Sequence, residues 1–364
     1  MRAFQLVEHG APGKFELRDV PDPKPAPGEV VVEVRACGLN HLDLWLEEAG
    51  LPIKVDLPRT PGGEVAGVIS AIGARRTYVA QDHSKPIDSR DVGASRSETW
   101  RVGDRVAVQS NLFCGQCEFC QRGEESMCLR SRLLGVDCDG GFAEKVVVPA
   151  SSLVRLPDNV SFETSAALTL AGSTAMHMLT DRAQVKEGDW VLAIGGASGV
   201  GSAAIQIAKA LGAHVISTGS TEAKRKLAQE LGAEFVVDSN DPKWPAEVRR
   251  ITNKRGVDIV VEHVGGEELV KCFDCLARGG TIVTCGATAG REVTLNLWPL
   301  FVKQQRLIGS YGRNRADMRA TLKWAAQGKL KSVVHSEFPL DRAAEAFTAL
   351  RERRVLGKVV ISNR

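Results

Sequence analysis

The sequence predicts an α/β protein in which a doubly wound parallel sheet is joined to a β-rich domain. Between residues 158 and 300, apolar strand-like runs alternate with segments of helical periodicity, which is the pattern of a parallel sheet covered by helices. Residues 1–73 instead contain β-rich runs separated by turn-rich segments such as PDPKPAPG. The chain has 364 residues, 43% of them apolar, which is enough for about two domains with a sizeable core.

Composition and charge exclude several classes of function. The net charge of +3 is small and no basic stripe or tail is present, so nucleic acid is not an expected partner. The start, MRAFQLVEHG, lacks an apolar signal core, and no apolar run is long enough to span a bilayer. Nine cysteines without a secretion signal favour thiols or a metal site over a disulfide scaffold. We expect a cytoplasmic protein without a membrane partner.

The N-terminal region predicts strands over residues 15–20 and 29–36, followed by a helix over 40–49. The glycine-bearing segment LPRTPGGEVAGVISAIG predicts a bulged or tightly turned strand. Residues 74–101 are polar and have little periodicity, which favours a solvated surface loop, with a lid or an interface arm as the alternative.

A cluster of cysteines with the spacing C-x2-C-x2-C-x7-C follows, formed by Cys114, Cys117, Cys120 and Cys128. Four thiolates on one short loop can complete a tetrahedral shell around Zn²⁺. Because sulfur fills every position, none is left for substrate or water, and the predicted zinc is structural, with one ion per chain. An iron–sulfur cluster and free reduced thiols are the alternatives.

The segment DWVLAIGGASGVGSAAIQIAKALGAHVISTGS predicts a strand, a glycine-rich turn, a helix and a second strand. Glycines let the backbone approach a pyrophosphate, and the N-terminus of the following helix offers free N–H groups. The turn therefore predicts a dinucleotide site, with an ordinary tight turn as the alternative. Its candidate cofactor-binding residues are Gly196, Ser198, Gly199, Val200 and Gly201.

The remaining elements continue the alternation of strand and helix. A helix capped by Ser161 is expected through SFETSAALTLAGSTAMHML. Further helices are expected over 222–231 and 267–277, with strands over 235–237, 257–262 and 281–285. The C-terminal part predicts helices near 316–327 and over 342–351 and a closing strand in GKVVIS.

The order of several segments along the chain resembles that of the medium-chain dehydrogenase/reductase superfamily. These segments are GLNHLD, PGGEVAGVI, VGDRV, the four-cysteine lobe, AGSTA, GGASGVG, VDIVVEHVGG, GSYG and GKVVIS. The resemblance covers nearly the whole chain except residues 74–101. It implies a GroES-like catalytic domain from residues 1–157 and 301–364, with a structural-zinc lobe at 111–130 and a polar insertion at 74–101. It implies a Rossmann NAD(P)-binding domain at 158–300, a nicotinamide in the cleft between the domains, and a homodimer or homotetramer.

The superfamily contains zinc alcohol dehydrogenases and zinc-free reductases that resemble quinone oxidoreductase. Where the former carry Cys, His and Cys as catalytic ligands, this chain has Asn40, Gly63 and Leu170. Gly63 and Leu170 offer no ligating side chain, and an amide is a poor zinc ligand. GLNHLDLW and PGGEVAGV resemble the quinone oxidoreductase branch, in which residues matching Asn40 and Asp43 line the nicotinamide pocket. His41 is a candidate proton donor, with solvent as the alternative.

The coenzyme preference is predicted from STGSTEAKRK, at the end of the second strand of the glycine-rich unit. NAD sites usually carry an acidic residue there, and this chain has none. Ser220 and Lys224 match residues that contact a 2′-phosphate in the resembling branch, and Arg225 is a weaker candidate. Lys224 and Arg225 also fit the solvated face of a helix, but we favour NADPH.

The resemblance also implies contacts that flank the nicotinamide. These are Thr174, Val264, Gly286 and Tyr311, with Lys358 as a further neighbour.

We therefore predict an NADPH-dependent reductase that transfers a hydride to a quinone, an enone or another activated alkene without a catalytic zinc. Hydride transfer to such acceptors needs less charge stabilisation than the oxidation of an alcohol, which depends on a Lewis acid at the alcohol oxygen. One alternative is a zinc-type alcohol dehydrogenase with relocated ligands, which would hold two metals per chain. The other is a dinucleotide-binding sensor with little turnover.

Overall fold

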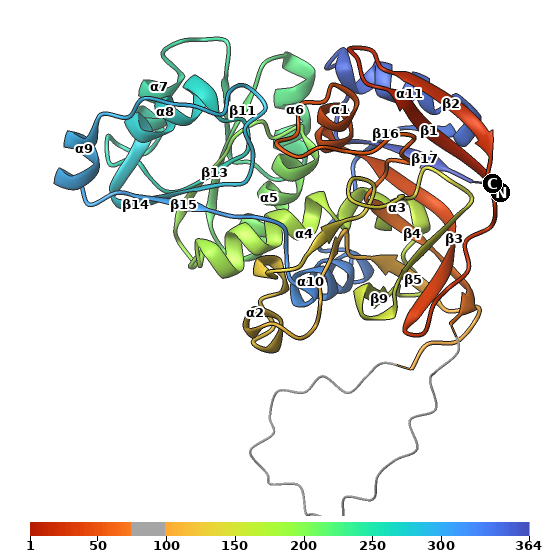
Figure 1. The fold of residues 1–364 in the computed structure, drawn as a ribbon. Coiled ribbons are helices and arrows are strands. Elements are labelled where there is room, and N and C mark those ends of the chain that lie inside the picture. The colour runs from red at the N-terminus through yellow and green to blue at the C-terminus, as the bar shows by residue number, and fades with distance from the viewer. Residues whose placement is uncertain (74–98, 364) are drawn as a thin grey trace, which may run out of the picture.

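The computed structural model describes residues 1–73 and 99–363. Most of the polar insertion predicted at 74–101 therefore lies outside the described residues. The described chain forms a β-rich part and a parallel-sheet part that lie side by side, with α4 (Ala171–Met176) and α5 (Gly199–Ala210) between them (Figure 1). Both chain termini lie on the β-rich side. This arrangement confirms the predicted fold class.

The β-rich part is built around a seven-stranded sheet in the order β16-β17-β3-β4-β5-β9, with β8 also paired to β3. Its strands are β3 (Glu29–Leu39), β4 (Glu64–Ile72), β5 (Arg105–Val108), β8 (Lys145–Pro149), β9 (Leu153–Arg155), β16 (Val334–Pro339) and β17 (Lys358–Ser362). Strand β3 pairs with β4 through Gly38 and Glu64, and with β17 through Leu39 and Val359. This register brings Glu64 and Lys358, almost 300 positions apart in the chain, to the same end of β3.

Two shorter pairs of strands complete the β-rich part. They are β1 (Arg2–Glu8) with β2 (Lys14–Asp19), and β6 (Asn111–Leu112) with β7 (Arg132–Leu133).

The second sheet has six parallel strands in the order β12-β11-β10-β13-β14-β15. These are β10 (Trp190–Ala193), β11 (His214–Gly219), β12 (Phe235–Asp238), β13 (Val257–Glu262), β14 (Leu276–Thr284) and β15 (Arg306–Gly309). The order reverses between β10 and β13, and ligands bind at such a switch point in doubly wound folds. The sheet extends past the boundary predicted at residue 300, because β15 pairs with β14.

Helices accompany both parts of the molecule. They are α1 (His41–Glu47), α2 (Glu118–Gln121), α5 (Gly199–Ala210), α6 (Glu222–Glu230), α7 (Trp244–Ile251), α8 (Gly266–Cys275), α9 (Leu297–Val302), α10 (Arg315–Ala326) and α11 (Ala343–Arg351). None of the described helices is long and apolar enough to cross a membrane.

The helix predicted from Ser161 is interrupted. Ser161 does cap it, since its hydroxyl accepts from the backbone N–H of Thr164 at 3.0 Å. However, α3 (Phe162–Leu168) ends before α4 (Ala171–Met176), and a π-helical turn (His177–Arg182) follows. The backbone N–H groups of Leu170 and Ala171 donate to the Glu64 carboxylate at 2.5 and 3.2 Å. A contact with a distant strand therefore interrupts a pattern that looked continuous in the sequence.

Candidate functional site

The switch point of the parallel sheet opens into a cleft of about 320 Å³ whose walls come from both parts of the molecule. Nine of the predicted site residues line it: Asn40, His41, Ser198, Gly199, Val200, Ser220, Lys224, Val264 and Lys358. The cleft has the place and the lining expected for a dinucleotide between the two domains.

The glycine-rich turn presents the N-terminus of α5 to this cleft. Ser198 is the N-cap residue, and its hydroxyl accepts from the backbone N–H of Gly201 at 2.9 Å. A β-carbon at Gly196 would lie 2.1 Å from Ser217 Oγ, and one at Gly201 would lie 2.2 Å from Gly195 O. Gly196 and Gly201 are therefore required for close packing behind the turn. The free N–H groups of α5 remain available for a pyrophosphate.

His263 is a cleft residue that the sequence analysis missed. Its Nε2 lies 3.1 Å from Ser198 Oγ and 3.0 Å from Ile194 O, so it braces the glycine-rich turn. Burial lowers the pKa of His263, which favours the neutral ring. The only signal in the sequence was its place at the carboxyl end of the strand in VDIVVEHVGG.

One end of the cleft carries positive charge. Lys224 Nζ lies 3.4 Å from Ser220 Oγ and 3.5 Å from the backbone oxygen of Arg353. Within the described part of the chain, no carboxylate pairs with Lys224, whereas Arg225 pairs with Asp238 at 2.9 Å. Lys224 is therefore the better candidate for a phosphate. Arg353 comes from the turn before β17, and no local pattern marked it.

The other end of the cleft contains a buried ion pair. Lys358 Nζ lies 2.8 Å from Glu64 Oε2, and the two side chains are 6% and 0% exposed. The ammonium also donates to Leu39 O at 2.7 Å and to Asn40 Oδ1 at 2.5 Å. The Asn40 amide donates in turn to Glu64 Oε2 at 3.1 Å. We call these three side chains the Asn40–Glu64–Lys358 network.

This network lies where the family resemblance would place a catalytic zinc. Asn40 and the backbone of Leu170 both contact Glu64, and Gly63 is its chain neighbour, so the three positions converge in space. A β-carbon at Gly63 would lie 3.0 Å from Leu134 O, which leaves little room for a larger side chain. With an ammonium at its centre and a single carboxylate, the group does not fit a zinc ion.

Asp43 and His41 differ in their placement. Asp43 is buried away from the cleft wall, where its carboxylate accepts from the N–H groups of Asn40 at 2.8 Å and Gly62 at 3.1 Å. Burial raises the pKa of Asp43 to about 6. His41 lines the cleft, and desolvation, aided by nearby His263 and by the positive charges of Lys358 and Arg353, lowers its pKa to about 4. His41 is therefore uncharged at neutral pH.

The remaining predicted cofactor residues do not line this cleft. Thr174 is buried within α4. Gly286 and Tyr311 line a second hollow of about 510 Å³ at the carboxyl ends of β14 and β15. A β-carbon at Gly286 would lie 2.3 Å from His263 O, so this glycine allows two chain segments to approach closely.

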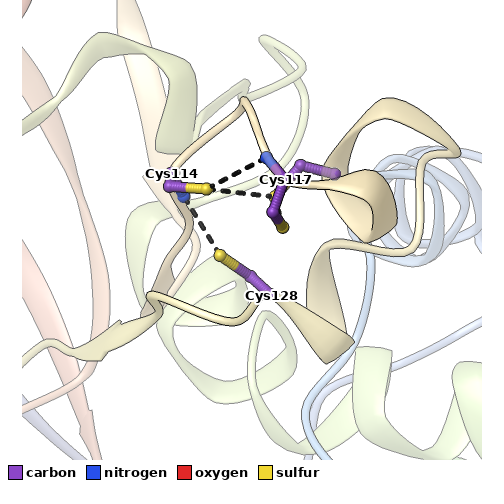
Figure 2. A group of neighbouring side chains, drawn as sticks. Cys114, Cys117 and Cys128 are labelled. Carbon is purple, nitrogen blue, oxygen red and sulfur yellow. Dashed lines mark hydrogen bonds between the residues drawn. The ribbon is translucent and has the colours of Figure 1, made fainter.

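The four-cysteine lobe brings its thiols together as predicted. Figure 2 shows three of them, Cys114, Cys117 and Cys128. The Sγ atoms of Cys114, Cys117, Cys120 and Cys128 all lie within 4.8 Å of one another. Cys120 Sγ lies 4.0 Å from Cys114 Sγ and 3.5 Å from Cys117 Sγ, and a tetrahedral zinc with bonds of ~2.3 Å requires a separation of ~3.8 Å. Among the described residues, this is the one group of three or more His, Cys, Asp or Glu side chains arranged to hold a metal.

Comparison with known families agrees with this architecture. The family model described as "Alcohol dehydrogenase GroES-like domain" matches residues 26–158, and the one described as "Zinc-binding dehydrogenase" matches residues 199–327. An alcohol dehydrogenase from Geobacillus stearothermophilus is 32% identical, covering 95% of this chain and 96% of that protein. An NAD-dependent alcohol dehydrogenase from Sulfurisphaera tokodaii is 30% identical and covers 99% of both chains.

Solved structures show the same similarity. A crystal structure of an NAD-dependent alcohol dehydrogenase superposes with a TM-score of 0.90 at 38% identity, covering 100% of both chains. A 2-octenoyl-CoA carboxylase reductase in complex with NADP and 2-octenoyl-CoA gives a TM-score of 0.85 at 27% identity, covering 99% of this chain and 87% of that one. The chain belongs to the alcohol dehydrogenase family, within the medium-chain dehydrogenase/reductase superfamily. It is an NAD(P)-dependent oxidoreductase.

Proposed function

We propose that this oxidoreductase uses NADPH to reduce a quinone, an enone or another activated alkene and has no catalytic zinc. The observation that carries the proposal is the Asn40–Glu64–Lys358 network, in which a buried ammonium lies among the positions where zinc ligands are expected. Without a Lewis acid, an alcohol oxygen has no strong stabiliser for its developing alkoxide. Hydride addition to a polarised C=C bond requires less stabilisation of the developing negative charge, which hydrogen bonds to the carbonyl can supply.

The bound nicotinamide would supply the hydride, and the chain's own residues would orient it. The N-terminus of α5 and Ser198 would hold the pyrophosphate, and Asn40, fixed by Lys358 and Glu64, would border the nicotinamide end. His41 is uncharged near neutral pH and is therefore a weak acid. We assign the final proton to solvent, with His41 and Asp43 kept as positioning residues.

The preference for NADPH is supported by the charge at the other end of the cleft. Strand β11 ends at Gly219 and is followed by Ser220, so no acidic side chain is placed for the ribose hydroxyls of NAD. Lys224→Ala should raise the KM for NADPH far more than that for NADH. Arg225→Ala is the matched control, because Arg225 is already paired with Asp238. Equal effects of Lys224→Ala on both coenzymes would contradict the assignment.

Alcohol dehydrogenase is the second candidate function, because the curated relatives at about 30% identity bear that name. Elemental analysis of protein purified without added metal, combined with assays in both directions, separates the two. One zinc per chain with NADPH-dependent reduction of enones or quinones supports the reductase. Two zincs with oxidation of simple alcohols support the dehydrogenase. Tight NADPH binding without turnover on any acceptor would instead favour a dinucleotide sensor.

We further propose a homodimer or homotetramer acting on a small-molecule substrate in the cytoplasm. Self-association is supported by exposed apolar side chains on α9 and the edge strand β15, namely Leu297, Trp298, Phe301, Val302 and Leu307. Light scattering on the purified chain tests it, with Trp298→Glu expected to lower the measured mass.

A further inference from the structure

Two cations at one end of the cleft have no carboxylate partner among the described residues. The lysine and arginine side chains that line the cleft are Lys224, Arg353 and Lys358, and none of its described lining residues is acidic. Lys358 is paired with Glu64, which leaves Lys224 and Arg353. Two unpaired cations that share one end of a cleft favour a ligand with more than one negative charge, such as a phosphate.

Arg353 differs from the arginines beside it in the chain. Arg351 and Arg354 each pair with a glutamate. In the part of the chain that the structure describes, no acidic side chain pairs with Arg353, which is exposed and lines the cleft. Desolvation lowers the pKa of His41, and the positive charge of Arg353 contributes to that shift, so the guanidinium lies close to the cleft wall. The side chain is therefore accessible to a ligand in the cleft.

The backbone of Arg353 gives a second, independent indication of a role for its side chain. Arg353 follows the C-cap residue of α11, its N–H donates to Leu350 O at 3.1 Å, and its φ is 56°. Glycine adopts this left-handed conformation at lower cost, because a β-carbon is disfavoured there. Backbone strain of this kind is concentrated at ligand-binding and active sites.

The turn that carries Arg353 is held against the parallel-sheet part. The N–H of Gly357 donates to Ala197 O in the glycine-rich turn at 2.7 Å, and Lys224 Nζ lies 3.5 Å from Arg353 O. Lys224 Nζ also lies 3.4 Å from Ser220 Oγ, just after the strand end where the adenosine ribose of a dinucleotide is expected. Arg353 from the β-rich part and Lys224 from the parallel-sheet part therefore meet beside the expected ribose.

We propose that Arg353 is a specificity-determining residue whose guanidinium binds the 2′-phosphate of NADPH opposite Lys224. This rests on the proposed use of NADPH and adds a ligand from the β-rich part, so that the phosphate joins the two parts of the molecule. A phosphate monoester carries between one and two negative charges at neutral pH, which suits two cations. The guanidinium can donate two parallel N–H bonds to its oxygens. NAD has no group at this position.

The first test measures nucleotide binding by isothermal titration calorimetry, with 2′,5′-ADP and 5′-ADP as probes. Arg353→Met should weaken binding of 2′,5′-ADP by about 10–100-fold and change that of 5′-ADP by less than about threefold. Arg354→Met is the matched control, because Arg354 is paired with Glu352 and does not line the cleft. Unchanged affinity for 2′,5′-ADP would overturn the proposal. Equal losses for both probes would overturn it too, since Arg353 would then bind a phosphate that NAD shares.

A double-mutant cycle shows whether Lys224 and Arg353 bind the same phosphate. The loss of 2′,5′-ADP affinity in the double variant Lys224→Ala/Arg353→Met should differ from the product of the single losses by more than about twofold. Independent losses would contradict a shared ligand.

Hydrogen exchange measures the link between the two parts of the molecule. In wild type, 2′,5′-ADP should slow exchange of the backbone amides of residues 350–357 more than 5′-ADP does, and in Arg353→Met the two probes should act equally. Equal slowing by both probes in wild type would overturn the bridging role.

Arg353→Gly separates a ligand contact from a structural role. Glycine fits the left-handed backbone, so this variant should raise the thermal unfolding midpoint while losing 2′,5′-ADP affinity as Arg353→Met does. A folded Arg353→Gly that binds 2′,5′-ADP as wild type does would overturn the proposal.

The same binding measurements distinguish failure of this proposal from failure of the proposed function. A loss of 2′,5′-ADP affinity in Lys224→Ala but not in Arg353→Met would overturn the role of Arg353 and leave the preference for NADPH in place. Tight binding that depends on Arg353, without turnover of any acceptor, would overturn the reductase and support the role of Arg353.

Discussion

The four-cysteine lobe and the Asn40–Glu64–Lys358 network hold positive charge by different means. In the lobe, four thiols within 15 consecutive residues surround the place for a metal ion, and three of the four are partly exposed. In the network, the charge is an ammonium of the chain itself, almost completely buried and held by side chains and backbone from β3, β4 and β17.

This difference indicates which role each site can have. A closed tetrahedral shell of sulfur stabilises the lobe and leaves no position for substrate. A buried ion pair at the cleft wall fixes Asn40 and the start of α4 but offers no Lewis acid. Under the proposed function, the chain keeps the structural-zinc lobe of a zinc dehydrogenase and has a buried ion pair in place of the catalytic zinc.

The largest effect is expected from removing the lobe's ligands. Replacing Cys117 and Cys120 together by Ser should reduce zinc content from about one ion per chain to nearly none, since apparent binding free energies at structural zinc sites are about 10–16 kcal/mol. Elemental analysis and thermal unfolding measure the loss. Cys138→Ser is the control because Cys138 is outside the cluster. Unchanged zinc in the double variant would show that the lobe is not the metal site.

The next largest effect is expected at the buried ion pair. Lys358→Met leaves the Glu64 carboxylate buried without its cation and should lower the free energy of unfolding by about 3–5 kcal/mol. Adding Glu64→Gln should recover much of this loss, as measured by urea denaturation. Lys271→Met, which breaks an ion pair of similar length with Glu268 near the surface, should cost at most about 1 kcal/mol. Equal losses of unfolding free energy in Lys358→Met and Lys271→Met would show that the buried pair is no more important for stability than the pair near the surface.

The pH dependence of stability tests the burial of Asp43, whose carboxylate accepts from the backbone N–H of Asn40. Burial raises the pKa of Asp43 from 3.8 to about 6, so the folded state binds its proton more tightly than the unfolded state. Stability from this group is therefore present below about pH 4 and is lost as pH rises to about 6, amounting to roughly 3 kcal/mol. Relative to Asp43→Asn, the wild type should lose stability across that window in urea titrations.

A matched carboxylate gives the opposite sign. The hydrogen bond from Arg155 lowers the pKa of Asp104, so stability from Asp104 should be gained as pH rises. The difference between wild type and Asp104→Asn should therefore slope the other way. The same slope for both variants would contradict the buried state of Asp43.

The smallest effect concerns the attachment of the lobe to the rest of the chain. Arg315 Nε lies 3.2 Å from the Oε1 of the buried Glu125, which links the lobe to α10. Arg315→Met should lower the unfolding free energy by about 1–3 kcal/mol and accelerate zinc release to a chelator. Arg122→Met is the control, because its pairs with Glu118 and Glu124 are exposed. An unchanged rate of release would mean that the lobe holds its metal independently of α10.

Features contiguous in the chain were predictable from the sequence. The spacing of the four cysteines predicted their clustering, and the glycine-rich sequence predicted the turn between β10 and α5 that lines the cleft. Alternating strands and helices predicted the doubly wound sheet, which the strand order confirms. Each of these depends on local backbone geometry, on periodicity or on ligand spacing within a few turns of chain.

Other features were decided by tertiary structure. The pairing of β3 with both β4 and β17 brings Glu64 to Lys358, and the Glu64 carboxylate then separates α3 from α4. Arg353 reaches the cleft and Arg313 reaches Ser110 from segments with no distinctive pattern. Strand register and domain packing place these groups, and both depend on contacts between residues far apart in the sequence. Local propensity and spacing do not encode such contacts, so the sequence determined which elements form, and packing determined which charges meet.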